Sequence, residues 1–177
     1  MVIILRIISG KYKGKKLKGY DIEGTRPTMD RVKESIYGII QGYVKDSVVL
    51  DLFAGSGSLG LEAISNGALK LILIDNNNKV VDTLNENIES FDEDIEVIKT
   101  DYKKYLKETN LKFDIIFLDP PYRAGLMNKA LKIIEERGLL NENGIVVCEF
   151  ENIKVETNLE LIREKKYGPK MVHIYRN

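Results

Sequence analysis

Apolar runs alternate with amphipathic segments along most of the chain, starting near residue 48. The runs are almost continuously apolar, as in strands buried on both faces. The segments between them repeat apolar residues every three or four positions, as helices do. The predicted strands are residues 48–53, 70–75, 95–100, 113–119 and 144–150, and the predicted helices are residues 58–66, 78–90, 102–108 and 125–137. Strands separated by helices predict a parallel sheet with helices on both faces.

The amino-terminal region has a different pattern. Two extended segments, residues 5–9 and 15–20, flank a loop that contains glycines and lysines, and they predict a small β-hairpin with basic residues at its tip. Thr28 then precedes an amphipathic segment and can act as the N-cap of a helix over residues 29–41. We therefore expect two parts, an amino-terminal extension over residues 1–24 and a main domain over residues 25–177.

The carboxyl-terminal region predicts two further strands. Residues 159–166 and 171–175 are extended segments on either side of the turn sequence Tyr167-Gly168-Pro169. They predict an antiparallel hairpin at the edge of the sheet. The complete prediction is an α/β fold with a seven-stranded, mostly parallel sheet, helices on both faces, this carboxyl-terminal hairpin and the small amino-terminal one.

A glycine-rich loop follows the first predicted strand of the sheet. Gly55, Gly57 and Gly60 have the spacing G-x-G-x-x-G, Asp51 precedes them, and Asp75 ends the next strand. In a Rossmann-like sheet this spacing indicates a nucleotide cofactor at the strand ends. A nicotinamide dinucleotide would place its pyrophosphate close to the carboxylate of Asp51, which is unfavourable in a partly desolvated cleft. S-adenosylmethionine carries an ammonium and a sulfonium group and no phosphate, so Asp51 favours it.

Two further acids extend this candidate cofactor site. Asp75 is expected to pair with ribose hydroxyls, although it could also begin the next helix together with Asn76. Asp101 follows the third strand and could either contact adenine or cap the helix after it. The set of residues expected around the cofactor is completed by Phe53, Asn76 and Tyr102.

A second motif, Asp119-Pro120-Pro121-Tyr122, follows the apolar strand of residues 113–118. Amino nitrogens of purine bases are poor nucleophiles because their lone pair is delocalised into the ring. The carboxylate of Asp119 and the carbonyl of Pro120 can accept their N–H bonds, and Tyr122 can stack on a base that has left its helix. A structural turn would not require all these groups at a strand end. The motif therefore indicates methyl transfer to an amino nitrogen.

The distribution of charge supports a nucleic-acid substrate. The chain has 27 basic and 27 acidic residues, but the net charge is +5 over residues 1–47, −9 over residues 48–162 and +4 over residues 163–177. Lysine-rich ends are often only solvated, yet beside a base-binding motif they indicate attraction of phosphates. The basic residues of the first twenty positions are Arg6, Lys11, Lys13, Lys15, Lys16 and Lys18.

Cysteine and hydropathy patterns limit the class of protein. The single cysteine, Cys148, has no partner for an intrachain disulfide, and no apolar run is long enough to span a membrane or form a secretory signal. No group of His, Cys or acidic residues has the spacing of metal ligands, so we expect no metal. A cytoplasmic protein is expected.

These motifs resemble those of the class I S-adenosylmethionine-dependent methyltransferases, and more narrowly the RsmD-like family, which methylates N2 of a guanine in 16S ribosomal RNA. The resemblance extends over almost the whole chain, and its most specific parts are residues 6–17 and the signature of residues 25–34. Residues 50–63, 113–122 and 148–151 resemble the other motifs of the family. Two departures are Ser58, where alanine is usual, and Tyr37, where phenylalanine is usual.

The resemblance implies a role for each candidate residue. Asp51, Gly55, Gly57, Asp75 and Asp101 would bind S-adenosylmethionine, and residues 119–122 would bind the target base. Arg26 and Thr28 would lie near the active-site cleft, and the basic hairpin would help to hold RNA through Lys11, Lys13, Lys15 and Lys16. The expected partner is ribosomal RNA or an assembly intermediate of the small ribosomal subunit. The sequence itself does not indicate an oligomeric state, and a monomer is taken as the default expectation.

Three alternatives remain at this stage. An adenine-N6 methyltransferase of DNA or RNA would share the glycine loop and the Asp-Pro-Pro-Tyr motif, but DNA enzymes of that kind usually need a target-recognition domain for which this chain has no room. An NAD-dependent oxidoreductase would have to accommodate Asp51. A non-catalytic RNA-binding factor is disfavoured because both motifs are intact.

Overall fold

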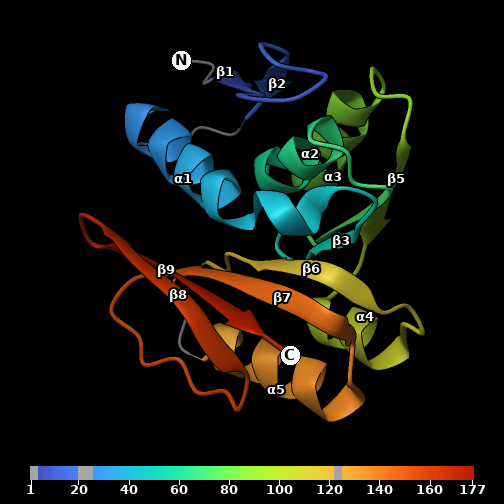
Figure 1. Ribbon diagram of the computed structural model, residues 1–177. Coiled ribbons are helices and arrows are strands. Elements are labelled where there is room, and N and C mark those ends of the chain that lie inside the picture. Colours follow the sequence, from blue (N-terminus) through green and yellow to red (C-terminus); the bar gives the residue numbers. More distant parts are fainter. Residues whose placement is uncertain (1–3, 20–25, 122–124) are drawn as a thin grey trace.

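The computed structural model of the chain describes residues 4–19, 26–121 and 125–177. In these ranges one sheet has seven strands in the order β5-β4-β3-β6-β7-β9-β8, and a second sheet pairs β1 with β2 (Figure 1). The strands of the large sheet are β3 (Val48–Asp51), β4 (Lys70–Asp75), β5 (Asp94–Lys99), β6 (Phe113–Leu118), β7 (Leu140–Phe150), β8 (Glu160–Tyr167) and β9 (Lys170–Arg176). Strands β3 to β7 are parallel, and β9 is antiparallel to both β7 and β8. The predicted α/β architecture is confirmed.

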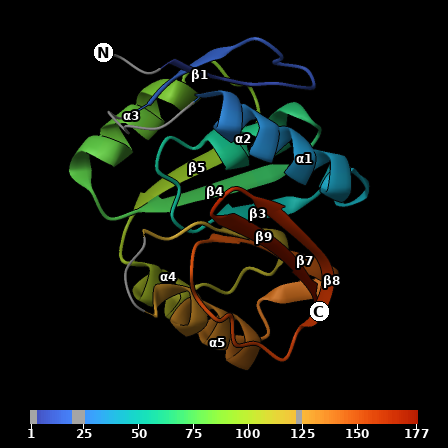
Figure 2. The same ribbon diagram turned by 90° about the vertical axis from the view of Figure 1, so that its left-hand side faces the viewer.

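Helices cover both faces of the sheet. The helices are α1 (Arg26–Val44), α2 (Ser58–Ser65), α3 (Asn78–Ile88), α4 (Tyr102–Glu108) and α5 (Leu126–Arg137). Figure 2 shows α1, α2 and α3 on one face and α4 and α5 on the other. Within the described residues, none of these helices is long and apolar enough to cross a membrane.

Alternation along the buried strands divides the core between the two faces. In β4, Leu71 and Leu73 pack towards α1, α2 and α3, whereas Ile72 and Ile74 pack towards α4 and α5. All four side chains are fully buried, because neighbouring residues of a strand point to opposite faces and both faces are covered. This explains why the strands read as continuous apolar runs rather than as alternating ones.

Helix α1 begins earlier than the sequence predicted. It starts at Arg26 rather than Met29, so Thr28 lies inside the first turn and is not the N-cap. Pro27 is compatible with this position because the first amide groups of a helix have no partner within the helix. Asp30, in the first part of this helix, forms an ion pair with Arg6 at 3.1 Å.

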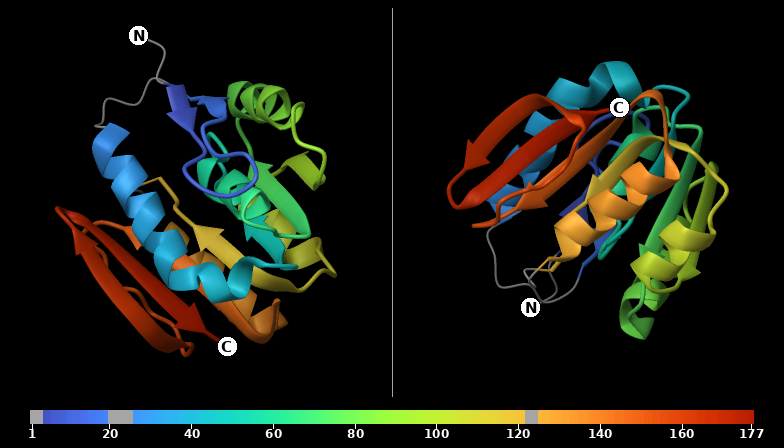
Figure 3. Two further views of the ribbon diagram at one scale, coloured as in Figure 1. Left: turned by 45° about the horizontal axis from the view of Figure 1, so that its top comes forward. Right: turned by 90° about the horizontal axis from the view of Figure 1, so that it is seen from below.

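The amino-terminal hairpin is part of the main core. Its strands are β1 (Ile4–Arg6) and β2 (Lys16–Lys18), and they pair antiparallel as predicted. Leu5, Ile7 and Leu17 are buried in the same cluster as the inner side chains of α1 and α2. Figure 3 shows the hairpin lying over the outer side of α2, between α1 and α3. It therefore adds a partial outer layer to the three-layer domain.

The carboxyl ends of the parallel strands meet at one edge of the sheet. The register pairs Asp51 with Phe117 and Leu118 with Cys148, so the ends of β3, β6 and β7 are adjacent. Since Phe150 pairs with Met171, the turn between β8 and β9 lies at this same edge. We call it the carboxyl edge. In open parallel sheets it is where ligands bind.

Candidate active site

Four acidic residues lie in a row along the carboxyl edge. Asp75, Asp51, Asp119 and Glu149 lie at the ends of the adjacent strands β4, β3, β6 and β7 or one residue away from them. Each lies two positions after a side chain that packs towards α1, α2 and α3; these side chains are Leu73, Val49, Phe117 and Val147. Because residues two apart in a strand point to the same face, all four acids project on this face of the sheet. The region is suited to groups that carry positive charge or N–H bonds.

Asp51 is the most buried acid of this row. Its residue is only 2% exposed, and its Oδ2 accepts the backbone N–H of Gly60 at 3.1 Å. Burial raises the pKa of Asp51 to about 7, the bond from Gly60 opposes this shift, and repulsion from Asp75 adds to it. The ionised carboxylate is thus destabilised in the protein alone. A cation bound beside it would remove that cost.

The glycine loop has a backbone conformation that favours glycine at two positions. Gly55 and Gly57 have φ values of +53° and +74°, in the left-handed region that side chains disfavour. A Cβ on Gly57 would also lie 2.8 Å from Leu84 of α3. Around Gly55 no heavy atom of the described residues lies within 4 Å of an added Cβ, so the loop is open there. These features fit a ligand that approaches the backbone at Gly55.

Asp75 orders the loop in addition to facing the site. Its Oδ2 accepts the N–H of Gly55 at 3.3 Å, and its Oδ1 accepts the N–H of Asn77 at 3.0 Å. Asn76 between them is exposed. The carboxylate of Asp75 therefore connects the end of β4 to the glycine loop that follows the neighbouring strand β3.

Asp101 is a helix cap. Its Oδ1 accepts the backbone N–H of Lys103 at 2.9 Å and of Lys104 at 3.3 Å, and this starts α4. The rings of Phe53 and Tyr102 lie 5.1 Å apart and form an aromatic contact beside the loop. One of the two interpretations of Asp101 is thus confirmed, and its contact with adenine stays a prediction.

The proline motif lies next to the acids of β3 and β7. Asp119 is partly buried, Pro120 is buried and Pro121 is exposed, whereas Tyr122 lies outside the described residues. Desolvation raises the pKa of Asp119 well above its usual range, repulsion from Glu149 and Asp51 adds to this, and Lys170 opposes it. The structure thus brings Asp119 close enough to Asp51 for the two acids to interact.

Glu149 and Lys170 were not among the candidate site residues. Glu149 is only 7% exposed, and its Oε1 forms an ion pair with Nζ of Lys170, the first residue of β9. The pair lies beside Asp119, because Leu118 pairs with Cys148 in the sheet. The strand-end position of Glu149 was a signal in the sequence. The partner was not predictable, because it comes from a strand that enters the sheet in the opposite direction.

Helix α1 holds the start of α2 through a buried ion pair. Lys33 is 4% exposed, and its Nζ lies 3.0 Å from Oε2 of the fully buried Glu62. The same Nζ donates to Oγ of Ser58 at 2.9 Å. Nearby, the hydroxyl of Tyr37 donates to the carbonyl of Leu59 at 2.6 Å. Ser58 and Tyr37, the two departures from the family pattern, therefore both make polar contacts between α1 and the segment after the glycine loop.

The hairpin also contacts the glycine loop from its other side. Asn87 of α3 is buried, its Oδ1 accepts the N–H of Lys18 at 2.8 Å, and its Nδ2 donates to the carbonyls of Lys18 at 2.9 Å and Ser56 at 3.2 Å. This amide thus joins β2, α3 and the glycine loop. Nothing in the local sequence around Asn87 indicated so distant a contact.

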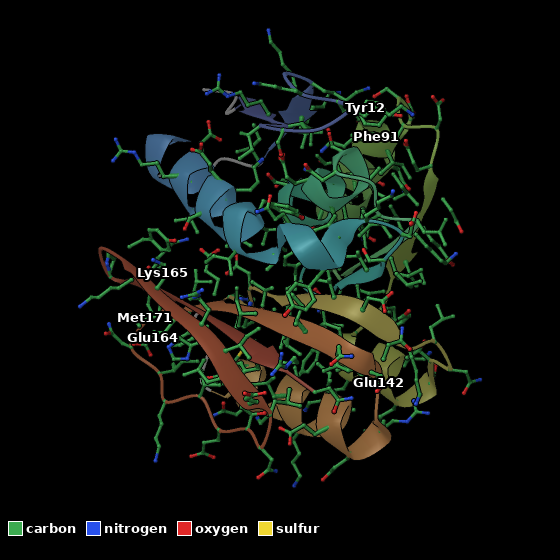
Figure 4. All side chains as sticks on the ribbon, in the orientation of Figure 1. Tyr12, Phe91, Glu142, Glu164, Lys165 and Met171 are labelled. Carbon is green, nitrogen blue, oxygen red and sulfur yellow. The ribbon has the colours of Figure 1, made fainter. Side chains whose placement is uncertain are left out.

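The hairpin lysines predicted to hold RNA do not lie near Asp119. The hairpin tip packs against the far ends of α2 and α3: the Tyr12 and Phe91 rings lie 4.5 Å apart, and Lys11 pairs with Glu93 at 2.8 Å. Nζ of Lys15 donates to the carbonyl and hydroxyl of one serine, Ser90. Figure 4 shows Tyr12 and Phe91 on the opposite side of the molecule from Lys165 of β8.

Two of the four hairpin lysines are exposed and are not engaged in the way that Lys11 and Lys15 are. Lys13 and Lys16 are exposed, and the described part of the chain provides no recorded ion pair for either. Arg26 and Thr28 belong to the first turn of α1, but their side chains lie outside what the structure describes. Contact of these residues with RNA stays a prediction.

A cleft of about 510 Å³ lies elsewhere, between the hairpin and α1. Its walls carry both signs of charge, with Arg6 and Lys13 facing Asp30 and Glu34. None of the four acids of the carboxyl edge lines it. The cleft is therefore separate from the candidate active site.

The fold and the site together define a class I S-adenosylmethionine-dependent methyltransferase: a seven-stranded sheet with one reversed strand, a glycine loop after β3 and acids at the strand ends. Comparison with known proteins narrows the class. The chain belongs to the family described as Conserved hypothetical protein 95, whose model matches residues 5–176.

The chain is also similar to known proteins over nearly the whole length of both sequences. The ribosomal RNA small subunit methyltransferase D of Haemophilus influenzae is 36% identical, with 98% of this chain and 94% of that protein covered. The protein of the same name from Escherichia coli K12 is 34% identical, with 97% and 89% covered. The solved structure of yhhF from Escherichia coli is 32% identical with a TM-score of 0.89, and 98% of both chains is covered.

Proposed function

We propose that this protein transfers a methyl group from S-adenosylmethionine to the N2 amino group of a guanine in small-subunit ribosomal RNA. The row of acids at the carboxyl edge carries this proposal, because it offers one site for a cationic donor and a second for an amino group. The names of the relatives support ribosomal RNA as the substrate. The choice of guanine N2 rests on the family resemblance and on the chemistry of the proline motif.

The residues of the glycine loop and the buried acid would hold the donor. Asp51 would face its ammonium group and lose the penalty of being ionised in a buried position. Asp75 would bind the ribose hydroxyls, and Gly55 would allow close approach of the backbone. When bound, S-adenosylmethionine supplies the methyl group, and the electron pair of the broken C–S bond stays on sulfur.

The proline motif would position and activate the amino group. The carboxylate of Asp119 and the carbonyl of Pro120 would accept the two N–H bonds, which localises the lone pair of the nitrogen and aims it at the methyl carbon. The nitrogen gains one C–N bond and releases one proton. Asp119 is placed to accept that proton, because its carboxylate would already accept one of the N–H bonds, and desolvation raises its pKa above the ordinary range of a carboxyl group.

The test is methyl transfer from isotopically labelled donor to small-subunit ribosomal RNA, followed by mass spectrometry of the nucleosides. N2-methylguanosine is the expected product, and Asp119→Ala should abolish its formation while donor affinity changes less than about twofold. N6-methyladenosine as the product would favour the adenine-specific alternative. Lost donor binding with retained turnover in Asp119→Ala would refute the role of this residue.

A further inference from the structure

The turn of the carboxyl-terminal hairpin brings a cluster of positive charge to the carboxyl edge. Between residues 163 and 170 the chain has four basic residues and one acidic residue. Lys165 and Lys166, near the end of β8, are both exposed, and no ion pair or hydrogen bond is recorded for them within the described ranges. Lys165 pairs with Val172 and so lies on the α1 face of the sheet, whereas Lys166 pairs with Met171 and lies on the opposite face. The acid, Glu164, lies 2.9 Å from Nε2 of His173 on the neighbouring strand.

The position of this turn is fixed relative to the active site. Lys170 pairs with Glu149 beside Asp119, and the hydroxyl of Tyr167 is hydrogen-bonded to Ser35 of α1. The turn is therefore held both to the sheet and to the helix that covers it.

Sheet register gives the separation between these lysines and the catalytic motif. Lys165 pairs with Val172, Val172 pairs with Glu149, and Asp119 follows the residue that pairs with Cys148. Three strand spacings of about 4.8 Å thus separate the backbones of Asp119 and Lys165 by about 14 Å. A nucleic acid whose base reaches Asp119 has phosphates within that range.

A third cation lies on the facing helix. Arg31 is exposed and is one helical turn before Ser35, so it lies on the side of α1 that contacts Tyr167. Figure 4 shows Lys165 at the projecting end of β8, on the same side of the molecule as the start of α1. The cations thus lie on both sides of the approach to the proline motif.

The tip of the amino-terminal hairpin lies far from the carboxyl edge. It contacts Ser65 at the end of α2, and the eight residues of α2 extend about 12 Å away from the glycine loop. Its cations Lys11 and Lys15 are already engaged by the loop after α3, at Glu93 and Ser90. Of the two basic hairpins, the carboxyl-terminal one is nearer to the chemistry.

We infer that Lys165, on the α1 face together with Arg31, and Lys166, on the opposite face of the same strand end, form a phosphate-binding surface around the exposed end of β8 that holds the RNA backbone next to the nucleotide being methylated. This inference rests on the proposed function for the identity of the ligand. Lysines on an exposed edge strand can also serve only to prevent edge-to-edge aggregation. Charge reversal separates the two roles, because glutamates protect an edge as well as lysines do but repel phosphates.

The experiment compares three proteins: the unchanged chain, K165E/K166E, and the control K107E/K112E. The control changes the same charge at exposed lysines at the end of α4 and just before β6, at the opposite edge of the sheet. The probes are a labelled single-stranded RNA of mixed sequence and a transcript of small-subunit ribosomal RNA, with Kd measured from 50 to 200 mM salt. Donor affinity and thermal stability are measured in parallel.

Two lost phosphate contacts predict a defined result. K165E/K166E should bind single-stranded RNA about 60-fold more weakly at 50 mM salt and about tenfold more weakly at 200 mM, with a salt slope reduced by about 1.4. The control should change less than about twofold, and donor affinity should stay the same in both. The neutral variant K165S/K166S should show a smaller shift in the same direction, which covers the case of a poorly folded reversal.

The outcomes distinguish this inference from the proposed function. RNA binding by K165E/K166E equal to that of the control overturns the phosphate-binding surface, even if N2-methylguanosine is formed. RNA binding that depends on these lysines, without any methylation of guanine by the unchanged chain, overturns the proposed function and supports the surface.

Discussion

The buried carboxylate of Asp51 makes donor affinity depend on pH. Burial raises its pKa to about 7, so the ionised fraction is about 9% at pH 6 and about 50% at pH 7. If only the ionised form accepts the cationic donor, the apparent Kd should fall about fivefold from pH 6 to pH 7. The α-ammonium group of the donor, with a pKa near 7.7–8.0, stays mostly protonated over this range.

The same shift affects the stability of the protein alone. A carboxyl group with an ordinary pKa of 3.8 in the unfolded chain and about 7 in the folded chain binds more protons when folded. Its contribution to stability is therefore present below pH 4 and is lost as the pH rises to 7, by about 4 kcal/mol in total. Donor binding should restore this loss, so stabilisation by the donor should increase with pH.

Titration calorimetry in buffers of different ionisation enthalpy measures donor affinity and the number of protons released on binding, and thermal denaturation with and without donor measures the change in stability. The unchanged chain should release up to one proton on binding S-adenosylmethionine near pH 6, whereas Asp51→Asn should release none and bind more weakly at every pH. Asp119→Asn controls for the other acid with a raised pKa. A fivefold change that persists in Asp51→Asn, or that disappears only in Asp119→Asn, would refute the role given to Asp51.

Substitutions at three other positions test the support of the site. Gly57→Ala should lower stability by about 1–3 kcal/mol in thermal denaturation and weaken donor binding, because φ is +74° and the new Cβ meets Leu84; an unchanged melting temperature would contradict this. Lys33→Met should lower the free energy of unfolding by about 3–5 kcal/mol in urea, because Glu62 stays buried without its cation, and a loss below 1 kcal/mol would mean that the pair is not needed. Asp101→Ala should lower the free energy of unfolding by about 1 kcal/mol, because the helix cap is lost, whereas Asp101→Asn keeps the cap. Weaker donor binding in Asp101→Asn, without a loss of stability, would then indicate the predicted adenine contact.

The order and type of the elements were predictable because the apolar pattern of each segment matches the way that segment is buried in the sheet or against it. The bounds of β4 and α4 are those predicted, since an apolar run and a capped amphipathic turn mark their limits. Strand β7 was predicted to begin at Gly144 and begins at Leu140. Its early part is polar and contains Asn143 with a positive φ, and pairing with Phe113, not propensity, keeps it in the sheet.

Contacts between distant segments were beyond the reach of the sequence pattern. The hairpin could be predicted from its alternation, but not the direction in which it lies along α2. That direction is set by the rings of Tyr12 and Phe91 and by the amide of Asn87, which meet partners far away in the chain. As a result, the acids of the site could be located from the sequence, because they lie at or next to strand ends. The positions of the lysines relative to Asp119 could not.

The separation of charge in the chain has a structural reason. A donor cation and an amino group require acids, whereas a nucleic-acid backbone requires cations, and both must meet at one edge of one sheet. In the acidic middle region, Asp75, Asp51, Asp119 and Glu149 lie at or next to strand ends. The basic carboxyl-terminal region returns antiparallel and places the backbone of Lys165 about 14 Å from that of Asp119. Phosphates close to the acids would be repelled, so the backbone of the substrate has to stay at the lysines while one base extends inward. Under the proposed function, this arrangement of charge would select a nucleotide that has left its stack.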